Sequence, residues 1–345
     1  MPSADPALAT LGQLASTRAS AQHPGEYLKD IQSLLGETLP ALERELAAAC
    51  GGAVPLDVAA AQLVGAGGKR VRPLTTLLMT AVCGGEPANA ISLAASVELI
   101  HSATLLHDDV MDEGEERRNR PTSRVLWGNL VSVLSGDLLL TQALQLVQST
   151  DIPGVMEDTL AAMRALIEGE VAQLKARNKD DLGLDGYLEI VRGKTASLFA
   201  HACRCGARVS DASEHDIDAA GQFGERVGIA FQIVDDVLDL EGVPHEVGKR
   251  LGHDLGEGKT TLPLAFALEG DAQSLRPLLI DARAGDTVAA ARVAQMPSVR
   301  AGCERARAFA RSETEAGLQA LCRLPDTRER GLLRQLVLGL IERRN

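Results

Sequence analysis

The sequence predicts an all-α protein, a single helical bundle around a central cavity. Long runs rich in Ala, Leu, Glu, Gln and Arg are separated by Gly or Pro, whereas the alternating β-branched or aromatic runs typical of strands are hard to find. Two similar acidic stretches, far apart in the chain, each end a long apolar helix. We expect them to converge across the bundle core, where helical proteins usually build metal sites, and this places them in one domain.

The chain divides into a loose N-terminal tail, residues 1–23, and an all-α domain, residues 24–345. The tail lacks a basic region followed by a long apolar core, so we do not expect a signal peptide. With 345 residues, 45% of them apolar, the chain has ample material for a core. The expected helices, with boundaries good to a few residues, cover 26–35, 38–50, 55–65, 73–83, 87–113, 122–149, 155–178, 184–209, 213–241, 261–269, 272–284, 297–320 and 327–343.

A basic, glycine-rich island, Gly65–Pro73, precedes the helix expected at 73–83. Its glycines allow a ligand close to the backbone, Lys69 and Arg72 supply positive charge, and a helix N-terminus attracts phosphate through free N–H groups. It is not a Walker A loop, because Leu63 and Arg70 stand where Gly and Ser or Thr are required. The alternative interpretation is a flexible turn with solvated basic side chains.

The first acidic stretch is Leu105–Asp112, at the end of the helix that follows. Asp108 and Asp112 are four residues apart and share one helix face, whereas Asp109 is rotated roughly 100° away. Phe231–Asp239 repeats the arrangement at the end of a later helix. The carboxylates of this second stretch are Asp235, Asp236 and Asp239.

These carboxylates predict a metal site. Like charges at this spacing repel and weaken a helix, so two such stretches on apolar helices need a compensating cation. Oxygen ligands without His or Cys favour a hard ion, and Mg²⁺ commonly takes one or two carboxylates together with substrate phosphates. One stretch alone would favour a solvated acidic face, but its repetition favours the metal.

Basic and polar residues surround the acidic stretches. Arg117 and Arg118 follow Asp112 closely enough to hold phosphate oxygens bidentately, although such a mixed-charge loop is otherwise ordinary solvated surface. Other polar residues interrupt apolar helices or flank a glycine-rich loop, and this loop could close over a diphosphate. The alternative interpretation is that they are ordinary helix-capping, core or surface residues. They are Lys194, Thr195, Gln232, Lys249 and Lys259.

Composition excludes several classes of function. A net charge of −12 argues against broad binding of nucleic acid or anionic membranes. The six cysteines are scattered without a CxxC pair, which indicates reduced thiols, and His201, Cys203 and Cys205 are expected to be packing residues rather than a zinc site. Because no apolar run reaches the ~18 residues needed to span a bilayer, we expect a cytoplasmic protein, at most peripheral to the membrane that receives its product.

These motifs together resemble the trans-isoprenyl diphosphate synthases, or polyprenyl synthetases, and most of all the medium- and long-chain, octaprenyl-type enzymes. The likeness runs from about Leu63 to Leu268, with a weaker match in RLPDTRERGLLRQLVLGLIERR. The resemblance implies an isoprenoid synthase bundle, usually a homodimer. The motifs are GGKRVRP, ELIHSATLLHDDVMDEGEERRNRPT, WGN, SGDLLL, GEVAQL, VRGKTASLF, GIAFQIVDDVLD and GHDLGEGKTTLPL.

The resemblance also implies the reaction. Isopentenyl diphosphate condenses with an allylic diphosphate whose leaving group is neutralised by two or three Mg²⁺ ions held at both acidic stretches. A hydroxyl at Thr195, backbone carbonyls near it and the Gln232 amide oxygen would stabilise the allylic cation, and a dry cavity would protect it from water. By position, the isopentenyl diphosphate site is Lys69, Arg72, His101 and Arg118, and the allylic side is Arg117, Lys194, Thr195, Gln232, Lys249 and Lys259.

Other functions are weaker interpretations. A class I terpene cyclase would carry an NSE- or DTE-like second site and leave the basic island unexplained, and a non-catalytic partner subunit would have lost part of an acidic motif. Asn119 and Arg120 replace a Gly common in the family, but no expected ligand is lost.

Small residues below Asp108 predict the product length. Ala103, Thr104, Ile100 and Val97 lie at successive turns on that side of the helix, and none is aromatic. Since short-chain members of the family place a bulky residue there, we expect an open tunnel and a medium- or long-chain product, with octaprenyl favoured. The alternatives are a short-chain farnesyl or geranylgeranyl enzyme and a tunnel floor on another helix, near Met163 or Leu166.

Overall fold

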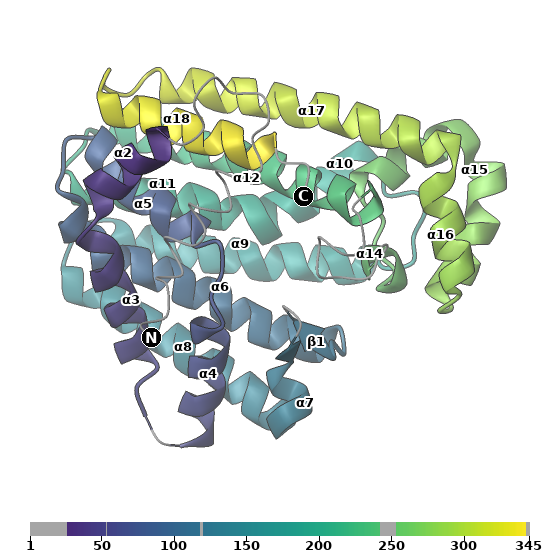
Figure 1. The fold of residues 1–345 in the computed structure, drawn as a ribbon, viewed down its shortest axis with the longest axis horizontal. Coiled ribbons are helices and arrows are strands. Elements are labelled where there is room, and N and C mark those ends of the chain that lie inside the picture. The colour runs from purple at the N-terminus through teal and green to yellow at the C-terminus, as the bar shows by residue number, and fades with distance from the viewer. Residues whose placement is uncertain (1–25, 53, 118–119, 242–252, 343–345) are drawn as a thin grey trace.

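The computed structural model describes residues 26–52, 54–117, 120–241 and 253–342. This part of the chain is helical almost throughout, which confirms the predicted all-α class (Figure 1). Its one sheet is a two-stranded antiparallel pair, β1 (Glu116–Arg117) and β2 (Arg120–Pro121), in the loop after the first acidic stretch. The predicted tail, residues 1–23, lies outside the described residues.

The helices follow one another along the chain with short connections. They are α2 (Glu26–Leu35), α3 (Thr38–Ala49), α4 (Pro55–Gly65), α5 (Val71–Val82), η1 (Pro87–Ala90), α6 (Ile91–Met111), α7 (Ser123–Trp127), α8 (Asn129–Thr150), α9 (Val155–Ala176), α10 (Gly183–Val191), η2 (Arg192–Ala196), α11 (Ser197–Val209), α12 (Glu214–Glu241), α14 (His253–Gly256), α15 (Leu262–Arg283), α16 (Thr287–Gln295), α17 (Pro297–Leu321) and α18 (Arg328–Ile341).

Three local features differ from the sequence prediction. The helix expected at 122–149 is divided at Gly128, whose φ of 86° is accessible to glycine but breaks a helix. The helix expected at 184–209 contains a π-helical turn, η2, which periodicity does not reveal. The prediction omitted α14 and α16, whereas the break expected near 270 corresponds to a kink at Asp271 within α15.

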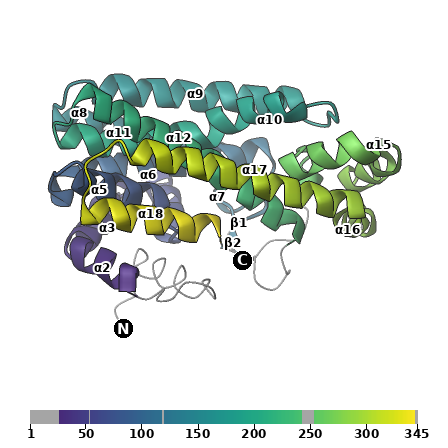
Figure 2. The same ribbon diagram turned by 90° about the horizontal axis from the view of Figure 1, so that it is seen from above.

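The second acidic stretch is positioned by close packing of α12 against α11. A Cβ on Gly224 would lie 2.4 Å from the carbonyl oxygen of Phe199, and one on Gly228 would lie 2.6 Å from Cα of Ala196. Only glycine permits this approach of the two helices. Figure 1 shows α17 and α18 along one edge of the bundle, with α4 and α7 at the opposite edge. In the turned view, α9 and α18 lie on opposite sides, with α11 and α12 between them (Figure 2).

Two helices of the described chain are long and apolar enough to cross a membrane when judged by length and composition alone. The first, Pro87–Met111, includes α6, and 67% of its apolar window is buried in the bundle. The second, α8, is 33% buried. A core helix of a globular bundle passes the same test, and α6 is such a helix, with Leu93, Leu99 and Ile100 fully buried.

Candidate active site

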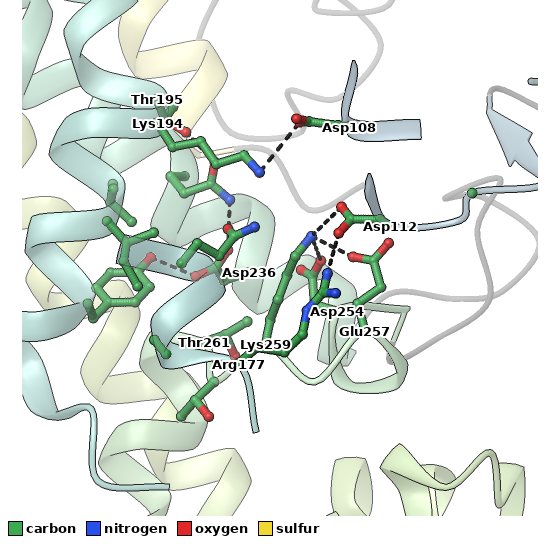
Figure 3. A pocket seen from close by; sticks show the side chains of 18 of the residues that line it. Asp108, Asp112, Arg177, Lys194, Thr195, Asp236, Asp254, Glu257, Lys259 and Thr261 are labelled. Carbon is green, nitrogen blue, oxygen red and sulfur yellow. Dashed lines mark hydrogen bonds and ion pairs between the residues drawn. The ribbon is translucent and has the colours of Figure 1, made fainter. Parts of the chain in front are cut away.

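Both acidic stretches line one cavity of about 250 Å³ (Figure 3). The predicted convergence across the bundle is therefore found: Asp108, Asp109 and Asp112 come from α6, and Asp236 comes from α12. Basic side chains share the cavity, and apolar side chains from α6 and α10 close it on one side. The basic residues are Arg117, Arg177, Lys194 and Lys259, and the apolar ones include Leu105, Leu182, Ile190 and Val191.

Lys194 contacts the first carboxylate of the first stretch. Its Nζ lies 3.4 Å from Oδ2 of Asp108 and 2.5 Å from Oε2 of Glu170 on α9. Burial raises the pKa of Asp108, and the Lys194 charge opposes this rise. Lys194 lies in the π-helical turn η2, which packs on α9 through two glycines: a Cβ on Gly169 would lie 2.5 Å from the backbone nitrogen of Lys194.

Arg117 holds the middle carboxylate. Its Nε donates to Oδ1 of Asp109 over 2.9 Å, and its Nη2 forms an ion pair with the same oxygen at 2.8 Å. Burial raises the pKa of Asp109, which is 4% exposed, and the nearby guanidinium opposes this. Since Arg117 belongs to β1, the small sheet after α6 fixes the cation that neutralises Asp109.

Both oxygens of Asp112 face cations. Nη2 of Arg177, at the end of α9, donates to Oδ1, and Nζ of Lys259 lies 3.7 Å from Oδ2. Lys259 also approaches Glu257 at 2.5 Å and Asp254 at 3.8 Å. Burial lowers the pKa of Lys259, but these carboxylates outweigh it, so its pKa is raised and the ammonium stays charged.

A chain of hydrogen bonds holds Asp236 in the second stretch. The Tyr187 hydroxyl donates to Oδ2 over 2.6 Å, and Nε2 of Gln232 donates to Oδ1 over 2.8 Å. The Thr195 hydroxyl donates in turn to Oε1 of Gln232 over 2.8 Å, which brings together the polar residues predicted near the cation. Burial, together with the charge of Asp254, raises the pKa of Asp236 to about 8.

The other carboxylates of the second stretch do not line this cavity. Oδ2 of Asp239 accepts from the backbone N–H of Asp254 over 3.3 Å, and the charge of Asp235 acts to raise the pKa of Arg72. No group of three His, Cys, Asp or Glu side chains in the described chain could hold an ion in this conformation. The oxygen donors of the cavity still fit a hard cation by their chemistry, and Lys and Arg now neutralise them.

The basic residues of the island have different surroundings. Arg70 is buried rather than solvated: its guanidinium contacts Glu43 on α3 at 2.9 Å and Glu98 on α6 at 2.8 Å, and it donates to the Val64 carbonyl over 2.7 Å. This clamp attaches the island to the helices around it. Lys69 is consequently left at the exposed surface beside the clamp.

Arg72 is half-buried and does not line the cavity. Its guanidinium carbon lies 4.7 Å from the centre of the Phe199 ring, and its buried Nε has no hydrogen-bond partner. Burial lowers its pKa, and the charges of Glu98 and Asp235 oppose this. His101 on α6 is half-buried. Two further predicted site residues, Arg118 and Lys249, lie outside the described residues.

The predicted chain-length residues lie below the cavity and do not line it. Val97, Ile100 and Ala103 are fully buried in α6, and the hydroxyl of half-buried Thr104 donates to the His101 carbonyl over 2.8 Å. The cavity residue nearest to them in sequence is Leu105.

Sequence reasoning missed several residues of the site. Gln173 and Arg177 line the cavity from the end of α9, and Glu170 contacts Lys194. The three are spaced by three and four residues, which places them on one helical face. That spacing was the available signal, since Glu170 and Gln173 belong to the motif GEVAQL. Tyr187 gave no comparable signal, because only packing brings α10 against Asp236.

Comparisons with known proteins agree with this geometry. The polyprenyl synthetase family model matches residues 55–296. The octaprenyl diphosphate synthase of Escherichia coli (strain K12) is 35% identical over 269 residues, covering 77% of this chain and 83% of that protein. The (2E,6E)-farnesyl diphosphate synthase of Mycobacterium bovis is 34% identical over 266 residues, covering 74% of each.

Solved structures show the same fold. A polyprenyl synthase from Caulobacter crescentus, complexed with calcium and isoprenyl diphosphate, superposes with a TM-score of 0.85 at 32% identity, over 91% of this chain and 97% of that one. A geranylgeranyl pyrophosphate synthetase from Pyrococcus horikoshii gives a TM-score of 0.83 at 31% identity, over 91% and 99%. With the family model matching most of the chain and both acidic stretches at one cavity, this chain belongs to the polyprenyl synthetase family.

Proposed function

We propose that this chain is a magnesium-dependent trans-prenyltransferase that elongates an allylic diphosphate with isopentenyl diphosphate to a medium- or long-chain all-trans product. The observation that carries the proposal is the single cavity in which carboxylates of both acidic stretches meet basic side chains from α9, η2 and the loop before α15. A diphosphate with hard cations is the ligand that this alternation of charge fits.

Acidic and basic residues of the site would have different roles. Asp108, Asp109 and Asp112, with Asp235, Asp236 and Asp239 of the second stretch, would hold two or three Mg²⁺ ions. Bound Mg²⁺ supplies Lewis-acid neutralisation of the diphosphate leaving group. Arg117, Lys194 and Lys259 would bind the allylic diphosphate oxygens, as would Lys249.

Other residues protect and orient the allylic group. Thr195 and Gln232, which are hydrogen-bonded to each other, would direct oxygen dipoles toward the position where positive charge develops, and the hydrogen bond from Gln232 to Asp236 would hold them there. The apolar side chains of Leu105, Ile190 and Val191 exclude water, which would otherwise quench an allylic cation.

The isopentenyl diphosphate site would be built on the basic island, with Lys69, Arg72, His101 and Arg118 as its residues. The clamp of Arg70 on Glu43 and Glu98 supports this assignment, because it fixes the start of α5 relative to α6. A fixed backbone lets an exposed lysine such as Lys69 meet a phosphate at little cost in ordering.

Octaprenyl diphosphate is the favoured product. Relatives of similar identity are named octaprenyl, nonaprenyl and farnesyl diphosphate synthases, so family membership leaves the length open. The small Ala103 and the half-buried Thr104 below Asp108 support the longer products.

A homodimer is the proposed assembly. Apolar side chains remain exposed on two neighbouring helices: Leu130 on α8 is 72% exposed, and Leu160 and Ile167 on α9 are 52% and 64% exposed. Large apolar side chains gathered on adjacent helices are typical of a subunit interface.

The decisive experiment is incubation of the purified chain with labelled isopentenyl diphosphate and geranyl, farnesyl or geranylgeranyl diphosphate, with product sizing. We expect Mg²⁺-dependent elongation to about eight isoprene units and no turnover in chelator. A cyclic hydrocarbon product would favour a terpene cyclase, and inactivity of the chain alone would favour a partner subunit.

A further inference from the structure

The cavity contains a cation for which the sequence motifs give no role. Arg177 is the residue after the last turn of α9, and its Nη2 donates to Oδ1 of Asp112. Its side chain is 30% exposed, whereas that of Asp112 is 9% exposed, so the guanidinium is the more solvent-accessible member of the pair. Arg177 and Lys259 both point at Asp112 in Figure 3.

The two cations on Asp112 differ in how strongly they are engaged elsewhere. Lys259 lies closer to Glu257, at 2.5 Å, than to Asp112, at 3.7 Å, and it also faces Asp254. Within the described contacts, Arg177 donates its side-chain hydrogen bond to Asp112 alone. Arg177 is therefore the principal cation on this carboxylate.

A clasp between two loops holds Arg177 in place. The backbone N–H of Asn178 donates to the Gly258 carbonyl over 2.9 Å, and the Thr260 hydroxyl donates to the Lys179 carbonyl over 2.7 Å. Nη1 of Arg283 donates to Asp180 over 2.9 Å on the far side. The backbone around Arg177 is thus tied to the loop that carries Lys259, and both cations keep their place at the site.

This arrangement has a consequence for metal binding. Both oxygens of Asp112 face cations, so a metal ion at this carboxylate would have to compete with Arg177 and Lys259. A guanidinium that leaves a carboxylate needs another anion, and a diphosphate in the same cavity offers oxygens of matching bidentate geometry.

We propose that Arg177 is a further allylic-diphosphate-binding residue that exchanges partners. It neutralises Asp112 in the metal-free protein and contacts the diphosphate once Asp112 serves the metal. This role rests on the proposed function and adds a residue to it. Its physical signature is that Arg177 opposes divalent-cation binding when diphosphate is absent and supports diphosphate binding when the cation is present.

The test measures binding in two titrations by calorimetry, with inorganic pyrophosphate as the probe. In Arg177→Gln, Mg²⁺ should bind several-fold more tightly in the absence of pyrophosphate, because Asp112 is freed. Pyrophosphate should bind about tenfold more weakly at saturating Mg²⁺, the size expected for loss of a hydrogen bond between charged groups. Arg177→Lys keeps the positive charge but not the bidentate guanidinium, so its affinities should lie between those of wild type and Arg177→Gln.

Lys175→Gln is the matched control, because it removes the same charge from an exposed position two residues earlier that does not line the cavity. It should leave both affinities unchanged. Equal affinities in Arg177→Gln and wild type would overturn the role. A variant that bound both Mg²⁺ and pyrophosphate more weakly and unfolded at a lower temperature would also overturn it, because Arg177 would then only stabilise the clasp. A wild-type protein that bound no pyrophosphate with Mg²⁺ would overturn the proposed function as well.

Discussion

Burial of His201 makes the stability of the fold depend on pH through this single residue. His201 on α11 is 2% exposed, its Nε2 lies 3.2 Å from the Thr159 hydroxyl and 3.5 Å from Sγ of Cys205, and burial lowers its pKa to about 4. Because the ordinary pKa is ~6.5, the unfolded chain takes up the proton first as pH falls. Stability from this residue is complete above pH ~6.5, is lost progressively down to pH ~4, and changes no further below that.

We expect the protonation equilibrium of His201 to lower the free energy of unfolding by about 2 kcal/mol at pH 5 relative to pH 7. The measurement is urea unfolding at both pH values for wild type and His201→Gln. The variant should be less stable at pH 7, where the contact of His201 with the Thr159 hydroxyl is lost, but the difference should shrink by about that amount at pH 5. Parallel pH profiles of the two proteins would contradict a neutral buried His201.

The two anion sites should be separable by single substitutions. Lys69→Ala should raise the KM for isopentenyl diphosphate by about tenfold, and Lys194→Ala should chiefly lower kcat or raise the KM for the allylic substrate, because each removes a charged hydrogen bond to one diphosphate. Steady-state kinetics with each substrate varied in turn would measure this. Lys29→Ala, at an exposed position on α2, is the control. Equal effects on both substrates from both variants would show that the sites are misassigned.

At the scale of elements, the contact between α9 and the π-helical turn η2 determines where Lys194 points. A Cβ on Gly193 would lie 2.7 Å from Cα of Gly169 and 2.8 Å from the Ala165 carbonyl oxygen. Backbone atoms cannot yield locally, so the two elements would have to move apart. The position of Lys194 relative to Asp108 and Glu170 depends on that spacing.

Gly193→Ala should therefore destabilise the protein by about 1–3 kcal/mol and lower kcat more than it raises either KM. Gly270→Ala provides the control, since a Cβ there meets no atom within 4 Å. Thermal unfolding and steady-state kinetics of the two variants are the measurements. Normal stability and kcat in Gly193→Ala would mean that the glycine contact does not position Lys194.

The interior of α6 is the element on which product length is expected to depend. Phe at Ala103 or Thr104 should shorten the product to farnesyl or geranylgeranyl diphosphate, because an aromatic ring would block the path below Asp108. Product sizing gives the result, and the unfolding temperature distinguishes blocking from overpacking at the fully buried Ala103. Active variants with unchanged products would place the tunnel elsewhere, for instance past Met163 or Leu166.

At the scale of the whole molecule, the exposed apolar side chains of α8 and α9 should be covered by a second copy of the chain. We expect light scattering to give a dimer, and Leu130→Glu or Ile167→Glu to produce monomers by placing charge in an apolar contact. Ile280→Glu on α15 is the matched control, since Ile280 is 62% exposed away from these helices. A wild-type monomer, or dimers of unchanged affinity in both variants, would contradict this interface.

The sequence by itself determined the helical class and most helix boundaries, because periodicity and helix-breaking residues act locally. It also identified both acidic stretches, since spacing along one helix decides which carboxylates share a face. The kink at Asp271 was likewise anticipated by a break near 270.

Only the tertiary structure decided which basic residues line the cavity and which pack elsewhere. Arg70 and Arg72 are alike in sequence, yet Arg70 is clamped because Glu43 and Glu98 approach it from α3 and α6, whereas Arg72 stacks on Phe199 of α11. Tyr187 and Arg177 reach the carboxylates only because α9 and α10 pack beside α6 and α12. The local sequence pattern does not predict these contacts, because the residues that bury each side chain and bond to it come from segments far away in the chain.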